Sequence, residues 1–229
     1  MNLKFLMTFA ALTLAATLAT TALAADSLPE VSHDGLHLLK NSKLRAVYMK
    51  PGANLDAYNK VALLACYVAF NKNWQRNYND DSMDLMDRIS DQDMKKIRDN
   101  LATEFNKIFT EVLSTKGGHQ MVTAGGDGVL VVQPAIVNLE VTAPDTMSAG
   151  MSQSFSASAG QMTLYMQLYD GKTGDIIARI IDPEAAGDDF VEVRNSVTNM
   201  ADAERVLRRW ATILNDHLAA VSAATSTKQ

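Results

Sequence analysis

The residues best suited to chemistry lie in one polar stretch, where two carboxylates follow two aromatic side chains. Asp80 and Asp81 are adjacent, and Trp74 and Tyr78 precede them with Arg76 in between. Paired carboxylates suit glycosidic hydrolysis, in which one acts as acid and the other as base or nucleophile. Together with an aromatic platform, they predict a glycan-binding or glycan-hydrolysing site. The alternative, which we favour, is a solvated loop that leads into a helix.

A second candidate site is the segment 144–160, which is low in charge and rich in Ser, Ala and Gly. Its large apolar side chains belong to Met147, Met151 and Phe155. Loops of this length inside compact domains are usually either functional or disordered. Two interpretations stay open. The segment is a flexible connector, or it is a flap that binds a partner through Met and Phe contacts and an added strand.

Other familiar site patterns are incomplete. The Gly-Lys-Thr at 171–173 lacks the glycine that a phosphate-binding loop needs five positions earlier, and a strand is predicted after it. His33 and His37 have i, i+4 spacing, but Gly35 between them disfavours the helix that would bring them to one metal. Cys66 lies in an apolar run with no neighbouring base to activate it. We therefore expect no cofactor and no metal, and enzymatic activity stays an open question.

The first 24 residues have the features of a cleaved secretory signal. Lys4 is followed by an apolar run up to Leu18, and Ala-Leu-Ala at 22–24 is a small-x-small cleavage site. Ala25 stands directly after this site, where a lipoprotein would have a cysteine. We therefore expect a periplasmic or secreted protein with one domain over residues 25–229.

Composition narrows the class of partner. The chain has 229 residues, of which 47% are hydrophobic and 21% charged, an ordinary globular composition. Its net charge is −5, and removal of residues 1–24, which hold one Lys and no acid, makes it −6. That charge argues against general affinity for nucleic acid or anionic lipid. No later stretch approaches the roughly 20 apolar residues of a membrane-spanning helix, so we expect no stable membrane insertion.

The clearest structural pattern lies in residues 161–181. Four apolar residues alternate with more polar ones: Met162, Leu164, Met166 and Leu168. The segment 170–175 is dense in turn-forming residues, and 176–181 returns as a second extended run. The pattern predicts a β-hairpin in the middle of a sheet. Further strands are predicted at 44–50, 61–70 (covered on both faces), 120–123 and 129–141, with a short extended piece at 190–194 after a polar link at 182–189.

Two amphipathic helices are predicted. Ser90 and Asp93 form a capping box before the first, which ends at the glycines 117–118. Asn199 is the predicted cap of the second. The helical stripes have apolar residues at spacings of three and four, with Phe105 and Trp210 near their centres. Strands grouped between two helices predict an α+β domain: a mostly antiparallel sheet of about five to six strands with both helices on one face.

Several segments together resemble a known family. They are Tyr48-x-x-Pro51-Gly52, the tetrapeptide 58–61 (Tyr-Asn-Lys-Val), the tract 74–79 (Trp-Gln-Arg-Asn-Tyr-Asn), 90–94 (Ser-Asp-Gln-Asp-Met) and 170–174 (Asp-Gly-Lys-Thr-Gly). They resemble the uncharacterised bacterial envelope family called domain of unknown function 3313. The resemblance covers most of the chain and implies an exported protein, often a lipoprotein, with no catalytic residues to carry over. This chain departs from that pattern because it lacks the lipidation cysteine.

The sequence therefore supports two hypotheses of different kinds. The first is a non-enzymatic binding or assembly module of the envelope, which binds an envelope protein or cell-wall component through a sheet edge or its long loops. The second is a module that binds or hydrolyses cell-wall glycan through the aromatic and acidic residues of 74–81. The oligomeric state and the ligand stay open.

Overall fold

The computed structural model describes residues 28–83, 85–142, 154–156, 160–186, 192–194 and 196–226. The expected signal segment 1–24 lies outside these residues, as do Met147 and Met151. The strands are β1 (His37–Leu38), β2 (Ala46–Met49), β3 (Lys60–Leu63), β4 (Tyr67–Phe70), β5 (Gln120–Met121), β6 (Val129–Val141), β7 (Ser154–Ser156), β8 (Gly160–Asp170), β9 (Ile176–Ala186) and β10 (Glu192–Arg194). The helices are α1 (Trp74–Asp81), α2 (Asp91–Glu111) and α3 (Ser196–Ser226), with 3₁₀ turns η1 (Leu55–Ala57) and η2 (Leu85–Asp87) and a π-helical turn η3 (Val112–Lys116).

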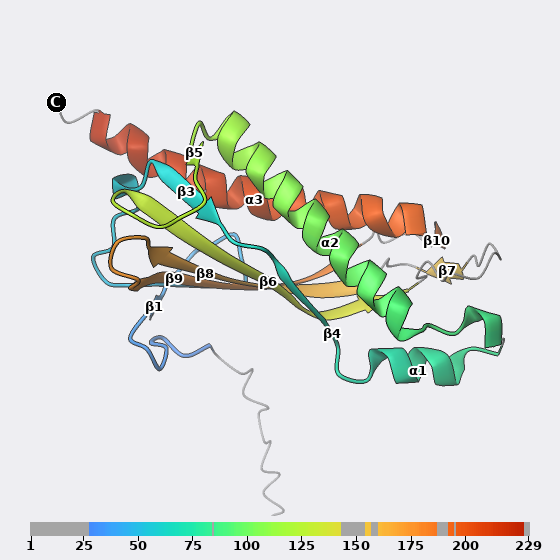
Figure 1. Ribbon diagram of the computed structural model, residues 1–229. Coiled ribbons are helices and arrows are strands. Elements are labelled where there is room, and N and C mark those ends of the chain that lie inside the picture. Colours follow the sequence, from blue (N-terminus) through green and yellow to red (C-terminus); the bar gives the residue numbers. More distant parts are fainter. Residues whose placement is uncertain are drawn as a thin grey trace, which may run out of the picture.

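One mixed sheet forms the centre of the domain, and α2 and α3 both cover the same face of it (Figure 1). Its strand order is β1-β2-β9-β8-β6-β3-β5, and β4 also pairs with β6. The α+β class is confirmed. The predicted number of five to six strands is wrong, because eight described strands share this sheet. The predicted strand at 120–123 is present as β5, but the segment 61–70 forms two strands, β3 and β4. The two-residue strand β1 was not predicted, because it carries too little alternation to be recognised from sequence.

Parallel pairing occurs only on the side of the sheet that contains β3, β4 and β5. The ladders from β1 through β9 and β8 to β6 are antiparallel, whereas β3 and β4 run parallel to β6, and β5 runs parallel to β3. Parallel neighbours need a crossover connection, which α1 and α2 supply between β4 and β5. The sheet is therefore less uniformly antiparallel than we expected.

The predicted hairpin is confirmed as β8 and β9, which pair in the middle of the sheet. Its inward residues Met162, Leu164, Met166 and Leu168 are all buried. Asp170 stabilises the turn, because its Oδ1 accepts hydrogen bonds from the amides of Lys172 and Thr173, each at 2.8 Å. Tyr58 donates to the other carboxylate oxygen at 2.7 Å, and these donors lower the pKa of Asp170 to about 2.

The strand predicted over 61–70 is divided in two by a proline on its neighbour. Pairing with β6 stops after Leu63 opposite Val132 and resumes at Tyr67 opposite Ala135. The Leu64 amide donates to the Val132 carbonyl at 2.9 Å, so even-numbered residues of this part of β6 face β3 and β4. Pro134 has no N–H to donate on that side, and the ladder breaks there. The prediction of one strand covered on both faces is wrong, since Tyr67 is 66% exposed.

The first predicted helix is confirmed. Ser90 Oγ accepts from the Asp93 amide at 3.2 Å and the Ser90 amide donates to Asp93 Oδ2 at 2.9 Å, which completes the capping box. The helix continues as η3 and ends at Gly117. The second helix, α3, begins at Ser196, so Asn199 lies inside it and is not its cap. Several residues of cap-forming type precede the apolar stripe, and the sequence could not select among them.

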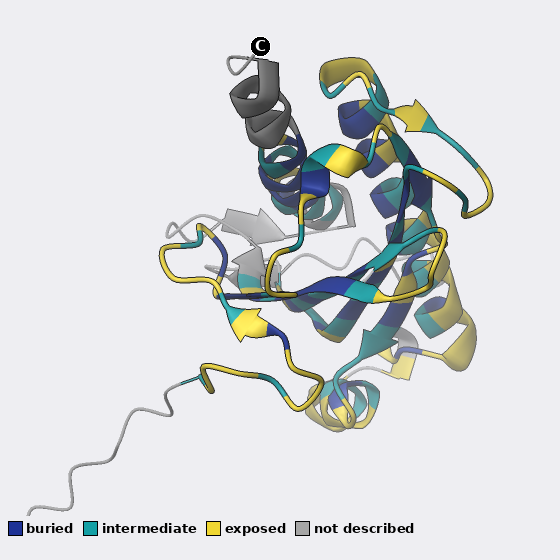
Figure 2. Cartoon of the chain, turned by 90° about the vertical axis from the view of Figure 1, so that its left-hand side faces the viewer, coloured by how far each residue is buried: buried dark blue, intermediate teal, exposed yellow. Residues whose placement is uncertain are grey.

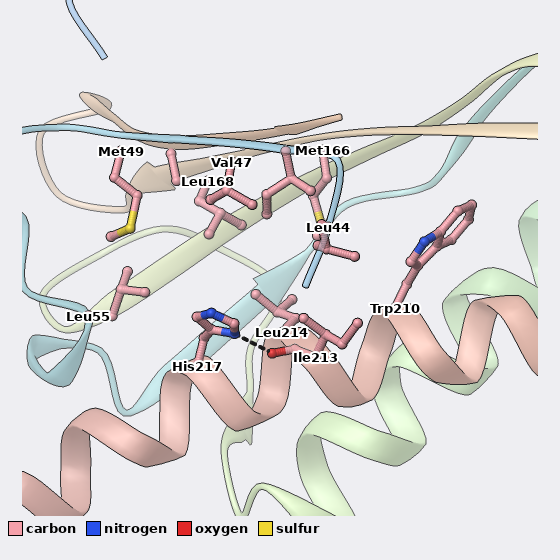
Figure 3. Close-up of a pocket in the computed structure, with 12 residues that line it drawn as sticks. Leu44, Val47, Met49, Leu55, Met166, Leu168, Trp210, Ile213, Leu214 and His217 are labelled. Carbon is pink, nitrogen blue, oxygen red and sulfur yellow. Dashed lines mark hydrogen bonds between the residues drawn. The ribbon is translucent and has the colours of Figure 1, made fainter. Parts of the chain in front are cut away.

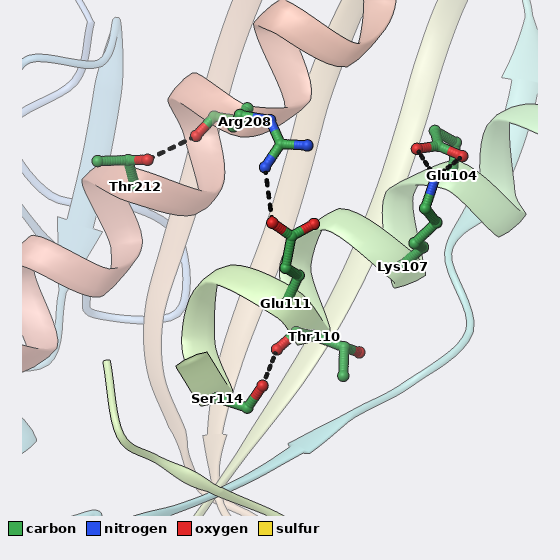
Figure 4. Close-up of polar contacts among 7 residues, drawn as sticks. All are labelled: Glu104, Lys107, Thr110, Glu111, Ser114, Arg208 and Thr212. Carbon is green, nitrogen blue, oxygen red and sulfur yellow. Dashed lines mark hydrogen bonds and ion pairs between the residues drawn. The ribbon is translucent and has the colours of Figure 1, made fainter. Parts of the chain in front are cut away.

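The two helices pack on each other as well as on the sheet. Arg208 of α3 donates to Glu111 of α2 at 3.1 Å, while Glu104 and Lys107 pair within α2 (Figure 4). Phe105 is fully buried and stacks on Phe109 with ring centroids 3.9 Å apart. Figure 2 shows the buried positions gathered on the sheet and on the inner sides of these helices.

The opposite face of the sheet is covered near β2 by the segment before β1. Leu36, Ala46 and Tyr48 form a small second apolar cluster there. Arg179 of β9 donates to Asp34 with Nη1 3.1 Å from Oδ1, and Tyr48 donates to the Pro29 carbonyl at 3.1 Å. Polar contacts of Arg179 and Tyr48 thus hold the edge segment in addition to apolar packing.

Candidate functional site

Trp74 and Tyr78 lie in helix α1, and not in the polar loop that the sequence predicts for this stretch. Trp74 is 8% exposed, stacks on Phe70 with ring centroids 4.6 Å apart, and lies 5.6 Å from the Tyr78 ring. The other side of α1 is held by Asn79, whose side chain accepts from the Ile89 amide at 2.7 Å and donates to the Ile89 carbonyl at 2.9 Å. The indole therefore anchors α1, and little of its surface is open to a sugar ring.

Asp80 and Asp81 are exposed at the C-terminal end of α1. Adjacent residues of a helix point in different directions, so α1 does not hold these two carboxylates opposite each other. Arg76 lies four residues before Asp80, on a different side of α1 from Trp74 and Tyr78. The structure thus brings the two aromatic residues together and separates them from Arg76.

The other predicted site residue within the described chain is Phe155. It lies in β7, opposite Val193 of β10 in a separate two-stranded antiparallel ladder. The segment 144–160 therefore contains a strand and is not wholly a loop. Period-2 alternation over three residues is too short a signal to have predicted this strand.

An open groove of about 580 Å³ lies between β4, the start of α1 and the first turns of α2. Eleven residues line it, and they define what we call the β4 groove: Tyr67, Val68, Ala69, Phe70, Asn71, Lys72, Asn73, Gln75, Arg76, Met94 and Arg98. This volume falls within the range of about 300–1,000 Å³ that is usual for ligand pockets.

The floor of the β4 groove is the outer edge of β4. Among the described strands, β4 pairs with β6 alone. The Asn71 amide, just after β4, donates to the Leu139 carbonyl of β6 at 3.0 Å. Backbone groups of successive strand residues point to opposite edges, so those of Val68 and Phe70 point away from β6 and toward the groove. The floor thus presents backbone donors and acceptors that no described strand uses.

The charged side chains that line the β4 groove are all cationic. They are Lys72 in the turn after β4, Arg76 of α1 and Arg98 of α2. None of the three forms an ion pair with any residue in the described part of the chain, whereas nearby Lys95 and Lys107 pair with Asp99 and Glu104. In a protein of net charge −5, a groove lined by three unpaired cations attracts anionic groups.

A second, much smaller cavity of about 30 Å³ lies between α3 and the sheet (Figure 3). Its lining is apolar, with Leu44, Val47 and Met166 on the sheet side and Trp210 on the helix side. His217 at its rim is not aimed at a ligand, because its Nδ1 donates to the Ile213 carbonyl at 2.8 Å. A void of this size and polarity is a packing defect and not a binding site.

Within the residues that the structure describes, no helix is long and apolar enough to cross a membrane. No cluster of three or more His, Cys, Asp or Glu side chains that could hold a metal ion occurs among them either. Cys66 is buried, and its burial raises the pKa of the thiol to about 12, so it is a poor nucleophile near neutral pH.

Residues 32–214 match the family described as protein of unknown function (DUF3313). The chain belongs to that family. The match confirms the resemblance drawn from the sequence segments. No curated protein matches this DUF3313 chain.

Two solved structures of PelC from Paraburkholderia phytofirmans, both dodecamers, are similar to this DUF3313 chain. One, a single-residue variant, has 10% identity and a TM-score of 0.36, and covers 76% of this chain and 95% of that chain. The other has 9% identity and a TM-score of 0.37, and covers 73% and 95%. Both similarities are too distant to indicate a function or an assembly for this chain.

Sequence reasoning selected Arg76 but missed the rest of the β4 groove. Lys72, Arg76 and Arg98 are scattered over 27 positions of sequence, in the turn after β4, in α1 and in α2. The one available signal was the break of a strongly apolar strand into Asn-Lys-Asn at 71–73, which places a cation at the end of that strand.

Proposed function

We propose that this DUF3313 protein is an exported, non-enzymatic binding module of the cell envelope, and that it holds a partner in the β4 groove. The observation that carries the proposal is the groove itself: a strand edge that no described strand pairs, beside three cations that have no ion pair among the described residues. Groups of this kind bind and orient a partner, and none of them is arranged as a nucleophile with its base. The sequence features of residues 1–24 support export.

The glycan-hydrolysing alternative has less support. It requires Trp74 as a platform and Asp80 with Asp81 as a pair, but the indole is 8% exposed and the two aspartates occupy adjacent helical positions. None of these three residues lines the β4 groove.

Export is tested by the intact mass of the protein recovered from its native cells. Cleavage after Ala24 leaves a chain that begins at Ala25 and carries no acyl group. A mass that includes residues 1–24 contradicts export by this route, and a mass with added acyl chains contradicts a protein free of lipid.

Binding in the groove is tested by a photo-crosslinking amino acid placed at Tyr67, which is 66% exposed at the groove. Thr173, exposed on the hairpin turn, is the matched control position. We expect a discrete adduct in intact cells from position 67 and not from 173, and we expect Arg76→Glu to remove it. The proposal is wrong if position 67 gives no adduct, or gives the same adducts as the control.

A further inference from the structure

The open edge of β4 and the cations around it point to one kind of partner. We infer that the β4 groove binds an extended acidic polypeptide segment, which adds to the sheet as a further strand beside β4. The inference rests on the proposed binding function and deepens it by naming the chemistry of the partner.

The backbone groups on the outer edge of β4 are oriented to bind another strand. Val68 and Phe70 present their N–H and C=O groups away from β6, as the hydrogen bond from the Asn71 amide to Leu139 requires. An extended polypeptide has complementary groups at the same two-residue repeat. Strand addition to an exposed edge of this kind is a common mode of peptide recognition, in which main-chain hydrogen bonds supply affinity.

The length of the β4 edge limits the size of the partner segment. β4 has four residues, so the edge it offers is about 13 Å long at roughly 3.3 Å a residue. The starts of α1 and α2 stand on either side, where Gln75 and Met94 line the groove. An edge of this length accepts a short extended segment and does not extend into an open-ended sheet.

The charge of the groove favours an acidic partner. Lys72 lies at the C-terminal end of the edge, Arg76 projects from α1, and Arg98 projects from α2. No acidic side chain lines the groove within the described residues. Carboxylates on the incoming strand would form charge-assisted hydrogen bonds with these cations. A second copy of this edge would bring the same cations together, and the like charges would repel.

A basic edge could instead serve only to prevent strand pairing, since lysine on an edge strand discourages aggregation. The exposed Tyr67 and the size of the groove argue for an occupant, because an edge that is merely protected needs neither an aromatic side chain nor an open volume beside it. An anionic glycan is the remaining class of partner. It would use the cations but not the two-residue repeat of backbone groups.

The test uses the protein as purified from its native cells and a fluorescent six-residue peptide of alternating glutamate and valine, followed by fluorescence anisotropy. Three further probes are matched to it: the same peptide with lysine for glutamate, the same peptide N-methylated at alternate amides, and oligogalacturonate. We expect only the unmodified acidic peptide to bind well. N-methylation removes backbone donors and should weaken binding about tenfold.

Protein variants locate the binding. Arg76→Glu and Arg98→Glu should each weaken binding of the acidic peptide at least about tenfold, because each replaces an attractive charge with a repulsive one. Lys43→Glu makes the same charge change at an exposed position outside the groove and should leave the affinity within about twofold. Added peptide should also slow exchange of the Val68 and Phe70 amide hydrogens.

Other results overturn the inference without touching the proposed function. If oligogalacturonate binds and the peptide does not, the partner is an anionic glycan. If N-methylation has no effect, the peptide is held by charge alone and no strand is added. If no probe binds although position 67 still gives its adduct in cells, strand addition by an acidic segment is wrong while a binding groove remains. If position 67 also gives no adduct, both the inference of strand addition and the proposed binding function are wrong.

Discussion

The indole Nε1 of Trp210 donates a 2.8 Å hydrogen bond to Oδ2 of Asp182, which is 3% exposed. The other carboxylate oxygen accepts from the Arg45 amide at 2.7 Å. One buried aspartate thus joins α3 to β9 and to the chain just before β2. Where the sequence predicts a polar link, β9 continues through Asp182 to Ala186 because it pairs with β8 along this whole length.

Trp210→Phe should destabilise the protein by about 1–3 kcal/mol, because it keeps most of the packing but leaves a buried carboxylate oxygen without its donor. Trp210→Ala should cost about 3–5 kcal/mol, since it also leaves a cavity. Urea denaturation of the three proteins measures both values. A Trp210→Phe variant as stable as the wild type would mean that the hydrogen bond contributes nothing.

Acid should weaken the contact between Asp34 and Arg179. The guanidinium, helped by the Ser32 hydroxyl, holds the pKa of Asp34 well below its ordinary value of 3.8. A depressed carboxyl pKa stabilises the fold above the unfolded-state pKa, and that stability is lost as pH falls through the folded-state pKa. We expect Asp34→Asn to be less stable than the wild type at neutral pH and the difference to shrink below about pH 4.

Urea denaturation from about pH 7 to about pH 2 measures this dependence. Asp127→Asn is the control, because its ion pair with Lys172 is exposed and exposed pairs contribute little. A constant difference between wild type and Asp34→Asn across the whole range would contradict the assignment.

Gly117 lies where the end of η3 meets α3. A Cβ atom there would be 2.0 Å from Asn215 Oδ1 and 2.7 Å from the Leu113 carbonyl oxygen. Gly117→Ala should therefore destabilise the fold by about 1–3 kcal/mol through overpacking. Asn215→Ala should relieve part of that cost, with a coupling of at least about 0.5 kcal/mol in a double-mutant cycle.

Gly118→Ala is the control for this cycle. Its φ of +67° disfavours alanine, but a Cβ there meets nothing within 4 Å. Its cost is due to backbone strain, and we expect it to add to that of Asn215→Ala without coupling. Coupling of equal size in both cycles would show that the close approach of Asn215 to Gly117 is not the cause.

Cys66 should react slowly with iodoacetamide in the native protein. It is 6% exposed, and burial raises the pKa of its thiol to about 12, so little thiolate is available near neutral pH. Unfolding in urea should expose it and restore ordinary reactivity. A Met83→Cys variant, at a fully exposed position, should gain one rapidly modified thiol under native conditions.

The sequence predicts most of what depends on local pattern. The alternation from Met162 to Leu168 and the capping box of Ser90 with Asp93 identify elements whose signals lie within the elements themselves. The break between β3 and β4 depends on Pro134, more than sixty residues away in sequence. A buried Asp182 is unpredictable for the same reason, because its hydrogen-bond donors come from distant segments.

The candidate site likewise combines residues that the sequence indicates locally with contacts that it cannot indicate. Trp74 and Tyr78 were selected by type, and the structure uses Trp74 to anchor α1. The β4 groove exists because a strand end, a helix start and a second helix meet, and only Arg76 among its cations was selected beforehand. Signals within single segments could not indicate an open strand edge, since which edge lacks a partner is decided by the order of strands in the sheet.

The dual pairing of β6 has a consequence for the order of folding. Its partner β8 and the hairpin with β9 are close in sequence, so we expect these contacts to form early. By contrast, β4 must close a long loop to pair Phe70 with Leu139. During synthesis, β3 and β4 are complete long before β6 exists, so their apolar residues have no strand partner until then. Pulse-labelling during refolding should therefore protect the amides of β8 and β9 before those of β4.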